Sequence, residues 1–192
     1  MKKQEMSCVD CAVQNCNKMD STYPNFCLTT HMDDAVLQEA MACYEEEENH
    51  KVMVAAAEVE SDHYCRYTRV EEIMAFAKKI GAKKIGIATC VGLLRESRTL
   101  ASILRAHGFE VFGIACKAGA QKKTSVGIPE RCNKVGENMC NPILQAKMLN
   151  EAKTDLNVVV GLCVGHDSLF YKYSEALTTC LLYTSDAADE AR

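Results

Sequence analysis

The stretch KIGIATCVGLLRESRTLASILRAHGFEVFGIAC, residues 84–116, decides the fold of this 192-residue chain. It opens and closes on short apolar runs, 84–90 and 110–116, which have the length and composition of buried strands. Between them, residues 92–107 have the periodicity of a helix, and Gly108 supplies the left-handed residue that ends it. A strand, a helix and a second strand in this order predict a parallel pair joined by a right-handed crossover.

The same alternation of elements continues on both sides of this stretch. Thr68 and Glu71 form a capping box, and Gly81 marks the end of the helix that they begin. Asn141 and Pro142 open another helix, as an N-cap followed by a proline in the first turn. These signals predict further helices over 68–80, 142–153 and 166–176 and a third strand over 156–163. Because the strands are apolar throughout, both faces of the sheet should be covered, which predicts an α/β fold with a three-layer parallel sheet, Rossmann/flavodoxin-like.

Composition divides the chain into four parts. We expect residues 1–32 to form a cysteine-rich metal-binding knot, 33–67 a helical segment packed on the core, and 68–179 the parallel α/β domain. The last part, 180–192, contains the string LLYTSDAADE, which resembles a translated sequencing adapter rather than a native tail. We therefore expect the native chain to stop near Thr179 with its last strand missing, which would leave an unpaired sheet edge that promotes aggregation.

The chain has 12 cysteines and a formal net charge of −4. No stripe of Lys and Arg interleaves with aromatic residues, so a nucleic-acid partner is not expected. No apolar run is long enough to span a membrane, and no apolar segment follows Lys2 and Lys3 as it would in a signal peptide. We therefore expect a cytoplasmic protein, in which thiols stay reduced and serve as metal ligands or catalytic groups rather than in disulfides.

Each of the three predicted strands has a glycine in its middle and a cysteine at its carboxyl end. These cysteines are Cys90, Cys116 and Cys163, and the carboxyl ends of parallel strands border the ligand crevice of an open α/β sheet. Cys140, just before the Asn-Pro cap, is expected over the same edge, with Cys132 as a fifth candidate. Any one of them alone is more simply a buried structural cysteine, but together they predict a shared cofactor site. Four thiolates suit an iron–sulfur cluster or zinc.

A second set of cysteines lies near the N-terminus with the spacing Cys8-x2-Cys11-x4-Cys16-x10-Cys27. A Cys-x2-Cys pair on a tight turn can hold one metal ion, so this set predicts a metal site. Cys65 follows the helical segment and is able to reach either site or to belong to the core. Cys43 is expected in a helix core and Cys180 adjoins the adapter-like tail, so neither is assigned as a ligand. Spacing alone does not separate zinc from iron–sulfur ligation.

Gly165, His166 and Asp167 follow the third predicted strand. Gly165 would permit a tight turn, after which His166 and Asp167 would point at the crevice as an acid–base pair or an extra ligand. An equally good interpretation is that Asp167 caps the next helix. The chain contains neither the Gly-x-Gly-x-x-Gly fingerprint nor a P-loop, so no NAD or ATP motif supports binding of these nucleotides.

Six stretches of the chain are similar to a bacterial and archaeal family known as domain of unknown function 1847. They are SCVDC (7–11) with NC (15–16) and FC (26–27), AAAEVE (55–60), KIGIATCVGL (84–93), RAHGFEV (105–111), NMCNPILQ (138–145) and GLCVGHDSLF (161–170). The resemblance covers about residues 6–179 and implies a metal-binding protein without an assigned reaction. It maps the family's cysteine pattern onto Cys8, Cys11, Cys16, Cys27, Cys65, Cys90, Cys116, Cys132, Cys140 and Cys163. Members of the family continue with another strand and a polar tail, from which this chain departs.

The residues leave three functions open. The leading one is a metal- or iron–sulfur-binding cytosolic protein with a redox role, whose thiolate ligands lie at the carboxyl edge of the sheet. The second is a small-molecule enzyme in which Cys90 or Cys163, with a low pKa, acts as the nucleophile and His166 as the base. The third is a non-catalytic zinc-binding module that serves folding or partner binding. The expected partners are a metal ion or cluster and, for the first two functions, a redox partner or a small molecule.

Overall fold

The computed structural model describes residues 6–18 and 22–181. The adapter-like segment after residue 181 therefore lies outside the described residues. The chain divides into two compact units, Met1–Val54 and Ala55–Arg192, which we describe separately. Within the described residues, no helix is long and apolar enough to cross a membrane.

The first unit is built of short helices. They are η1 (Cys8–Asp10), α1 (Asn15–Lys18), α2 (Leu28–His31), α3 (Asp34–Cys43) and the start of α4 (Glu47–His63). Asp33 caps α3 by accepting a hydrogen bond from the amide of Ala35 at 2.9 Å. None of the described residues of α1, α2 or α3 is buried. The expectation that Cys43 lies in a helix core is therefore wrong: it is exposed, because α3 has no buried face.

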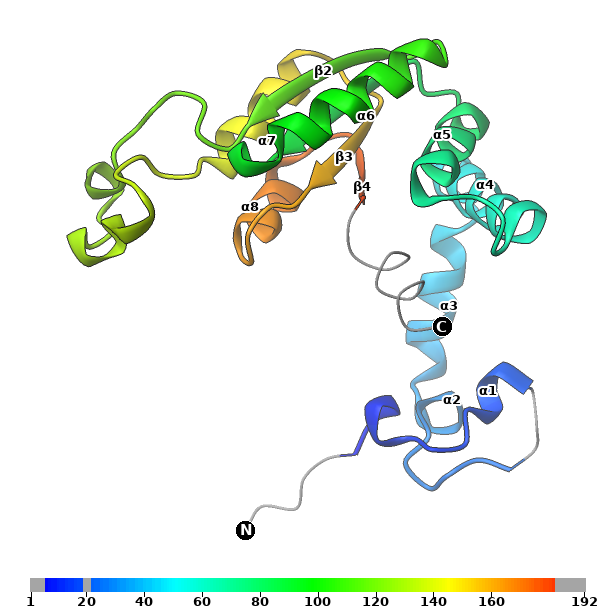
Figure 1. The fold of residues 1–192 in the computed structure, drawn as a ribbon. Helices are drawn as coiled ribbons and strands as arrows, with labels where there is room; N and C mark the ends of the chain where they lie inside the picture. The colour runs from blue at the N-terminus through cyan, green and yellow to red at the C-terminus, as the bar shows by residue number, and fades with distance from the viewer. Residues whose placement is uncertain (1–5, 19–21, 182–192) are drawn as a thin grey trace. The chain divides into compact units, whose positions relative to one another are not determined.

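The second unit contains a four-stranded, all-parallel sheet (Figure 1). Its strands are β1 (Lys84–Thr89), β2 (Glu110–Ala115), β3 (Leu156–Val160) and β4 (Leu177–Cys180), in the order β2-β1-β3-β4. The three strands expected from the sequence are confirmed. The fourth strand, β4, was not predicted. It forms near Thr179, where the sequence analysis expects the native chain to stop with its last strand missing. It pairs with β3 in a register that runs from Leu156 opposite Leu177 to Val159 opposite Cys180.

Helices cover both faces of this sheet (Figure 1). They are α5 (Arg69–Ile80), α6 (Leu94–Ala106), α7 (Pro142–Glu151) and α8 (His166–Tyr173). On the face of α5 and α6, Ile87 of the sheet and Leu104 of α6 belong to one buried cluster. On the face of α7 and α8, Val159 of the sheet and Phe170 of α8 belong to another. The predicted α/β class and the three-layer arrangement are therefore confirmed.

The helix signals in the sequence correspond to hydrogen bonds in the structure. The Thr68 amide donates to the Glu71 carboxylate at 2.8 Å, and the Glu71 amide donates to the Thr68 hydroxyl at 3.4 Å, which completes the capping box. The hydrogen bond from the Thr68 amide is the main cause that lowers the pKa of Glu71. Gly81 ends α5 with a φ of 79°, and Asn141 caps α7 by accepting from the Leu144 amide at 3.0 Å.

The outer edge of β4 is partly covered by α5. Arg69 Nε donates to the Cys180 carbonyl at 3.2 Å, and Arg69 Nη2 donates to the Thr179 hydroxyl at 2.9 Å. This side chain thus occupies a backbone acceptor that a further strand would use. The unpaired edge that a missing strand would leave is therefore satisfied in part within the chain.

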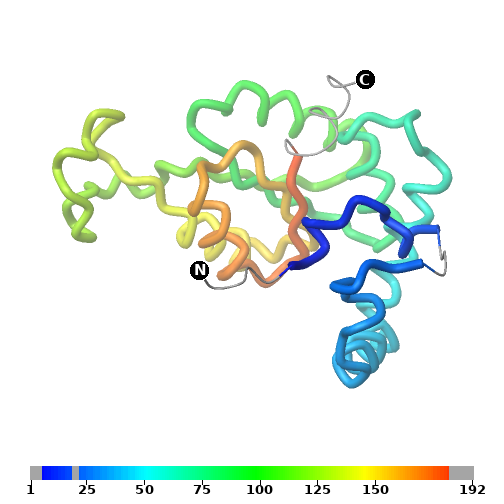
Figure 2. The backbone as a smooth tube through the Cα atoms, turned by 90° about the horizontal axis from the view of Figure 1, so that it is seen from below, coloured from blue at the N-terminus to red at the C-terminus, as the bar shows by residue number. Residues whose placement is uncertain are grey.

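The connection between β2 and α7 extends away from the sheet, as Figures 1 and 2 both show. It carries two 3-10 helices, η3 (Lys123–Val126) and η4 (Glu130–Val135). Lys123 is buried, and its ammonium group donates to the carbonyls of Cys132 and Gly136 at 2.5 and 2.6 Å. The hydrogen bonds of this buried lysine therefore link η3 to η4 and to the residue that follows η4.

Candidate thiol site

The position of β1 in the sheet defines where a ligand crevice is expected. In the chain β1 is followed by β2, which lies on one side of it, while β3 lies on its other side. The connections therefore leave the middle of the sheet in opposite directions, and open α/β sheets bind ligands outside the carboxyl ends of their strands at such a switch point. Cys90 directly follows β1, and Cys116 directly follows β2. The structure thus places both thiols at this edge.

Cys116 takes part in two backbone hydrogen bonds and accepts a third hydrogen bond at its sulfur. It is 3% exposed, its amide donates to the Thr89 carbonyl at 2.9 Å, and its carbonyl accepts from the Asn141 amide at 2.7 Å. The Val91 amide, in the 3-10 turn η2 (Val91–Leu93), donates to the Cys116 sulfur at 3.3 Å. Cys116 therefore lies where the end of β1 meets the start of α7.

Cys90 and Cys140 lie beside Cys116. Both are half-buried and pack against the apolar cluster that contains Cys116 and Leu162. The backbone bond between Asn141 and Cys116 brings Cys140 to this edge from a distant part of the sequence. The Cys140 side chain lies close enough to Cys116 to contribute to the raised pKa of the Cys116 thiol. The structure thus brings together three of the four thiols that were predicted to share a site.

The surroundings of Cys116 favour its protonated form. Burial raises the pKa of this thiol from the ordinary 9.0 to about 11, and the neighbouring thiols of Cys140 and Cys90 add to the rise. The hydrogen bond from the Val91 amide acts in the opposite direction. A thiolate at this position would therefore be stabilised most by a positive charge placed next to it.

Gln145, which the sequence analysis does not single out, supports this edge from α7. Its side chain is fully buried, and Nε2 donates to the carbonyls of Thr89 at 3.1 Å and Ile114 at 2.9 Å. These bonds join the ends of β1 and β2, after which two of the thiols follow. Oε1 of the same amide is buried without a hydrogen-bond partner among the described residues. A polar residue on the apolar face of a predicted helix is the sequence signal that points to it.

Cys163 and Cys132 are not gathered with these three thiols. β3 ends three residues before Cys163, which is exposed on a turn where its carbonyl accepts from the His166 amide at 2.9 Å. The predicted strand over 156–163 is therefore too long, since the chain turns at Gly161 with a φ of 61°. Cys132 is exposed on η4, in the loop that extends from the sheet. In the described part of the chain, no three His, Cys, Asp or Glu side chains are arranged to hold a metal ion together.

The N-terminal cysteines lie on separate short elements. Cys8 is in η1, Cys16 is in α1, Cys11 follows η1, and Cys27 precedes α2. Cys8 and Cys16 are exposed, whereas Cys11 and Cys27 are half-buried. Burial raises the pKa of Cys27, but hydrogen bonds, chiefly from Thr29, outweigh burial and lower it overall. Over residues 6–18 and 22–181, the structure does not gather these thiols into one ligand group.

Cys65 belongs to the second unit. It follows α4 in a left-handed conformation with a φ of 56°, which is uncommon for a residue other than glycine, and it is exposed. His63 and Tyr67 flank Cys65 in the sequence. Their rings stack on each other, with their centroids 3.7 Å apart. Its membership of the N-terminal ligand set stays a prediction.

The turn predicted at Gly165 is present, with a φ of 81°. Gly165 is itself the N-cap of α8, and the Asp167 carboxylate accepts from the amide of its neighbour Ser168 at 2.8 Å. The interpretation of Asp167 as the helix cap is therefore wrong. Among the described residues, no hydrogen bond joins the His166 side chain to Asp167 or to Cys163. The acid–base pair thus stays a prediction.

Among solved structures, Dph2 from Pyrococcus horikoshii with a 4Fe-4S cluster is similar to this chain. The two are 19% identical with a TM-score of 0.32, over 50% of this chain and 23% of the Dph2 chain. A similarity at this level carries no conclusion about the fold or the cluster of this protein.

Sequence comparisons identify the family of the chain. Residues 27–181 match the model of a family described as "Protein of unknown function (DUF1847)". The uncharacterized protein MJ0455 of Methanocaldococcus jannaschii is 46% identical over 147 residues, which cover 77% of this chain and 76% of that protein. The matched region includes the whole sheet and the three thiols gathered at its carboxyl edge. The chain therefore belongs to the DUF1847 family.

Proposed function

We propose that this protein binds a metal ion or an iron–sulfur cluster through thiolates at the carboxyl edge of its sheet. Cys90, Cys116 and Cys140 would be ligands, with Cys163 as the fourth. The observation that carries the proposal is the convergence of the first three at the switch point, where Cys90 and Cys140 pack against the buried cluster that contains Cys116. A redox role would follow from a cluster and a structural role from zinc.

The chemistry of these donors suits a soft cation. Thiolates select zinc and iron–sulfur clusters over hard cations such as magnesium. Ligation removes the thiol proton, and the charge of a bound cation offsets the burial and the thiol neighbours that raise the pKa of Cys116. The Val91 amide, 3.3 Å from the Cys116 sulfur, is a hydrogen-bond donor of the kind that adjusts the reduction potential of a cluster.

Metal binding requires a local rearrangement, because no three His, Cys, Asp or Glu side chains of the described residues are arranged to hold a metal ion. The rearrangement includes the fourth ligand, Cys163, which is not gathered with the other three thiols. Cys163 lies on a turn between Gly161 and Gly165, whose φ values are 61° and 81°. A Cβ atom at Gly165 would meet no other atom within 4 Å, so the space beside this residue is open. Because glycine adopts both signs of φ, rotation at these two residues can reorient Cys163 at low cost.

A separate metal site is proposed for the N-terminal set within the first unit, with the ligands Cys8, Cys11, Cys16 and Cys27. Its support is the Cys-x2-Cys spacing, which the structure forms as a single turn. The Cys11 amide donates to the Cys8 carbonyl at 3.2 Å across η1. Two thiols on one tight turn are the arrangement by which short loops begin to hold a metal ion.

The other two functions have less support. The enzyme hypothesis needs a base beside Cys90 or Cys163, and His166 is the base that it names. Between Cys163 and His166 the described hydrogen bond is a backbone one. The non-catalytic zinc module differs from the leading proposal in the bound metal and in redox activity, so metal analysis separates the two.

Metal analysis of the full chain, purified without oxygen, tests the proposal. Iron, acid-labile sulfide and zinc are measured per chain in the wild type and in the Cys116→Ala and Cys140→Ala variants. Cys43→Ala is the matched control, because Cys43 is exposed on α3 and belongs to neither ligand set. We expect both site variants to lose metal while the control keeps the wild-type content. Iron with an equal amount of sulfide indicates a cluster, and zinc alone indicates a zinc site. Equal metal content in all four proteins would refute the proposal.

A further inference from the structure

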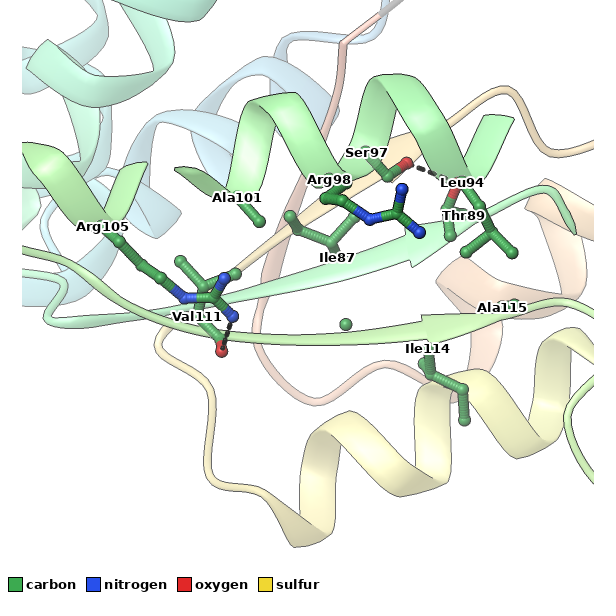
Figure 3. Close-up of a pocket in the computed structure, with 11 residues that line it drawn as sticks. Ile87, Thr89, Leu94, Ser97, Arg98, Ala101, Arg105, Val111, Ile114 and Ala115 are labelled. Carbon is green, nitrogen blue, oxygen red and sulfur yellow. Dashed lines mark hydrogen bonds between the residues drawn. The ribbon is translucent and has the colours of Figure 1, made fainter. Parts of the chain in front are cut away.

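A gap separates α6 from β2 on one face of the sheet. The register places Gly113 opposite Ile87 and Ala115 opposite Thr89, so these four residues point to the face that α6 covers. Gly113 and Ala115 are too small to fill the space beneath the helix. A pocket of about 250 Å³ opens there between α6 and β2 (Figure 3).

Two arginines of α6 form the rim of this pocket. Arg98 and Arg105 are seven residues apart, which places them on the same side of the helix about 10 Å apart along its axis. Figure 3 shows both side chains on the pocket side of α6. Arg105 Nη2 donates to the Val111 carbonyl at 3.3 Å. In the part of the chain that the structure describes, neither guanidinium group forms an ion pair with a carboxylate.

The floor of the pocket is apolar, and one end of it is polar. Ile87 and Val111 of the sheet line the floor, and Ala101 lines the pocket from α6. At the end of β1, the Ser97 hydroxyl donates to the Thr89 hydroxyl at 2.6 Å, and this pair is buried. The pocket therefore combines an apolar surface with two cationic groups that have no acidic partner among the described side chains.

We propose that this pocket binds a small organic anion, with an apolar body on the floor and a phosphate or carboxylate group held by Arg98 and Arg105. Guanidinium groups bind phosphate and carboxylate through paired charge-assisted hydrogen bonds, which are stronger than neutral ones. The volume lies just below the usual range of about 300 to 1,000 Å³ for drug-sized ligands, so the ligand is compact. The pocket is lined by no cysteine, and the proposal does not depend on metal binding at the thiols.

Binding of phenyl phosphate, measured by isothermal titration calorimetry on the full chain, tests this proposal, with phenol as the neutral analogue. The first variant, Arg98→Gln with Arg105→Gln, removes both cations. The second, Gly113→Val, adds an apolar side chain to the floor, at a position where a Cβ would lie 3.6 Å from the nearest atom, in Ile87. The control is Arg95→Gln, since Arg95 is exposed on the same helix but does not line the pocket.

We expect phenyl phosphate to bind the wild type at least about tenfold more tightly than phenol does. The double arginine variant and Gly113→Val should each weaken phenyl phosphate binding by about tenfold or more, and Arg95→Gln should leave it unchanged. The proposal is overturned by a wild type that shows no saturable binding. Equal weakening by Arg95→Gln and by the double variant, or full binding by Gly113→Val, would also overturn it. Metal content should stay the same in all these variants.

Discussion

Cys116 should make the metal-free protein less stable as the pH rises from 9 to 11. In the folded chain burial, first of all, raises the pKa of this thiol to about 11, whereas its ordinary value is 9.0. Between these two values the folded state keeps the proton and the unfolded state releases it. Stability is therefore fully present below about pH 9 and is lost as the pH rises through about 11.

The size of the effect follows from the two pKa values. Their difference of about 2, from 9.0 to about 11, corresponds to an upper limit of about 2.7 kcal/mol. The site lies at the edge of the sheet, where solvent screens part of the interaction, so we expect about 1–2 kcal/mol. This is a large share of the stability of a typical domain, which is about 5–15 kcal/mol.

Urea unfolding of the metal-free chain at several pH values between 8 and 10.5 measures this effect. The wild type, Cys116→Ala and the exposed control Cys43→Ala are compared, because other groups that titrate in this range then cancel in the differences. We expect the free energy of unfolding to fall more steeply with pH in the wild type and in Cys43→Ala than in Cys116→Ala. Identical pH dependence in all three proteins would show that the assignment to Cys116 is wrong.

Three further predictions follow from the same structure. Gly86→Ala should lower the free energy of urea unfolding by more than about 2 kcal/mol, since its Cβ would lie 2.1 Å from Asn157 Oδ1. Gly113→Ala is the control: its Cβ has room, so this variant should not destabilise the fold. Asn141→Ala removes the cap of α7 and should cost about 1 kcal/mol in the same assay. A strong chelator should lower the melting temperature of the metal-loaded wild type, because metal that binds the folded chain stabilises it. In Cys116→Ala this decrease should be smaller, and an equal decrease would place the metal elsewhere.

Much of the fold follows from local signals in the sequence. The capping box at Thr68, the left-handed Gly81 and the Asn-Pro pair at 141–142 each fix a helix boundary through bonds within a few residues. The fourth strand escaped prediction because Leu177-Thr-Thr-Cys180 is short and half polar. Its place in the sheet depends on pairing with β3, a contact that no local pattern reveals.

The site was predictable where thiols follow strands and not where they depend on distant contacts. Cys90 and Cys116 could be placed because parallel strands end at one edge. The contact between Cys140 and Cys116 rests on a backbone bond from Asn141, across a loop of more than 20 residues, whose path the sequence does not give. Cys163 was placed too near the edge because the strand before it ends earlier than its apolar sequence indicates.

The most direct test of the central claim is the sulfur coordination of metal bound at the sheet edge. X-ray absorption spectroscopy is measured on anaerobically purified protein that carries Cys8→Ala and Cys11→Ala, so that the N-terminal pair no longer contributes. The account predicts bound zinc or iron with a shell of sulfur ligands, at about 2.3 Å for zinc, and its loss on further substitution of Cys116 and Cys140 by alanine. A protein without metal, or a shell of nitrogen and oxygen that survives those two substitutions, would contradict it.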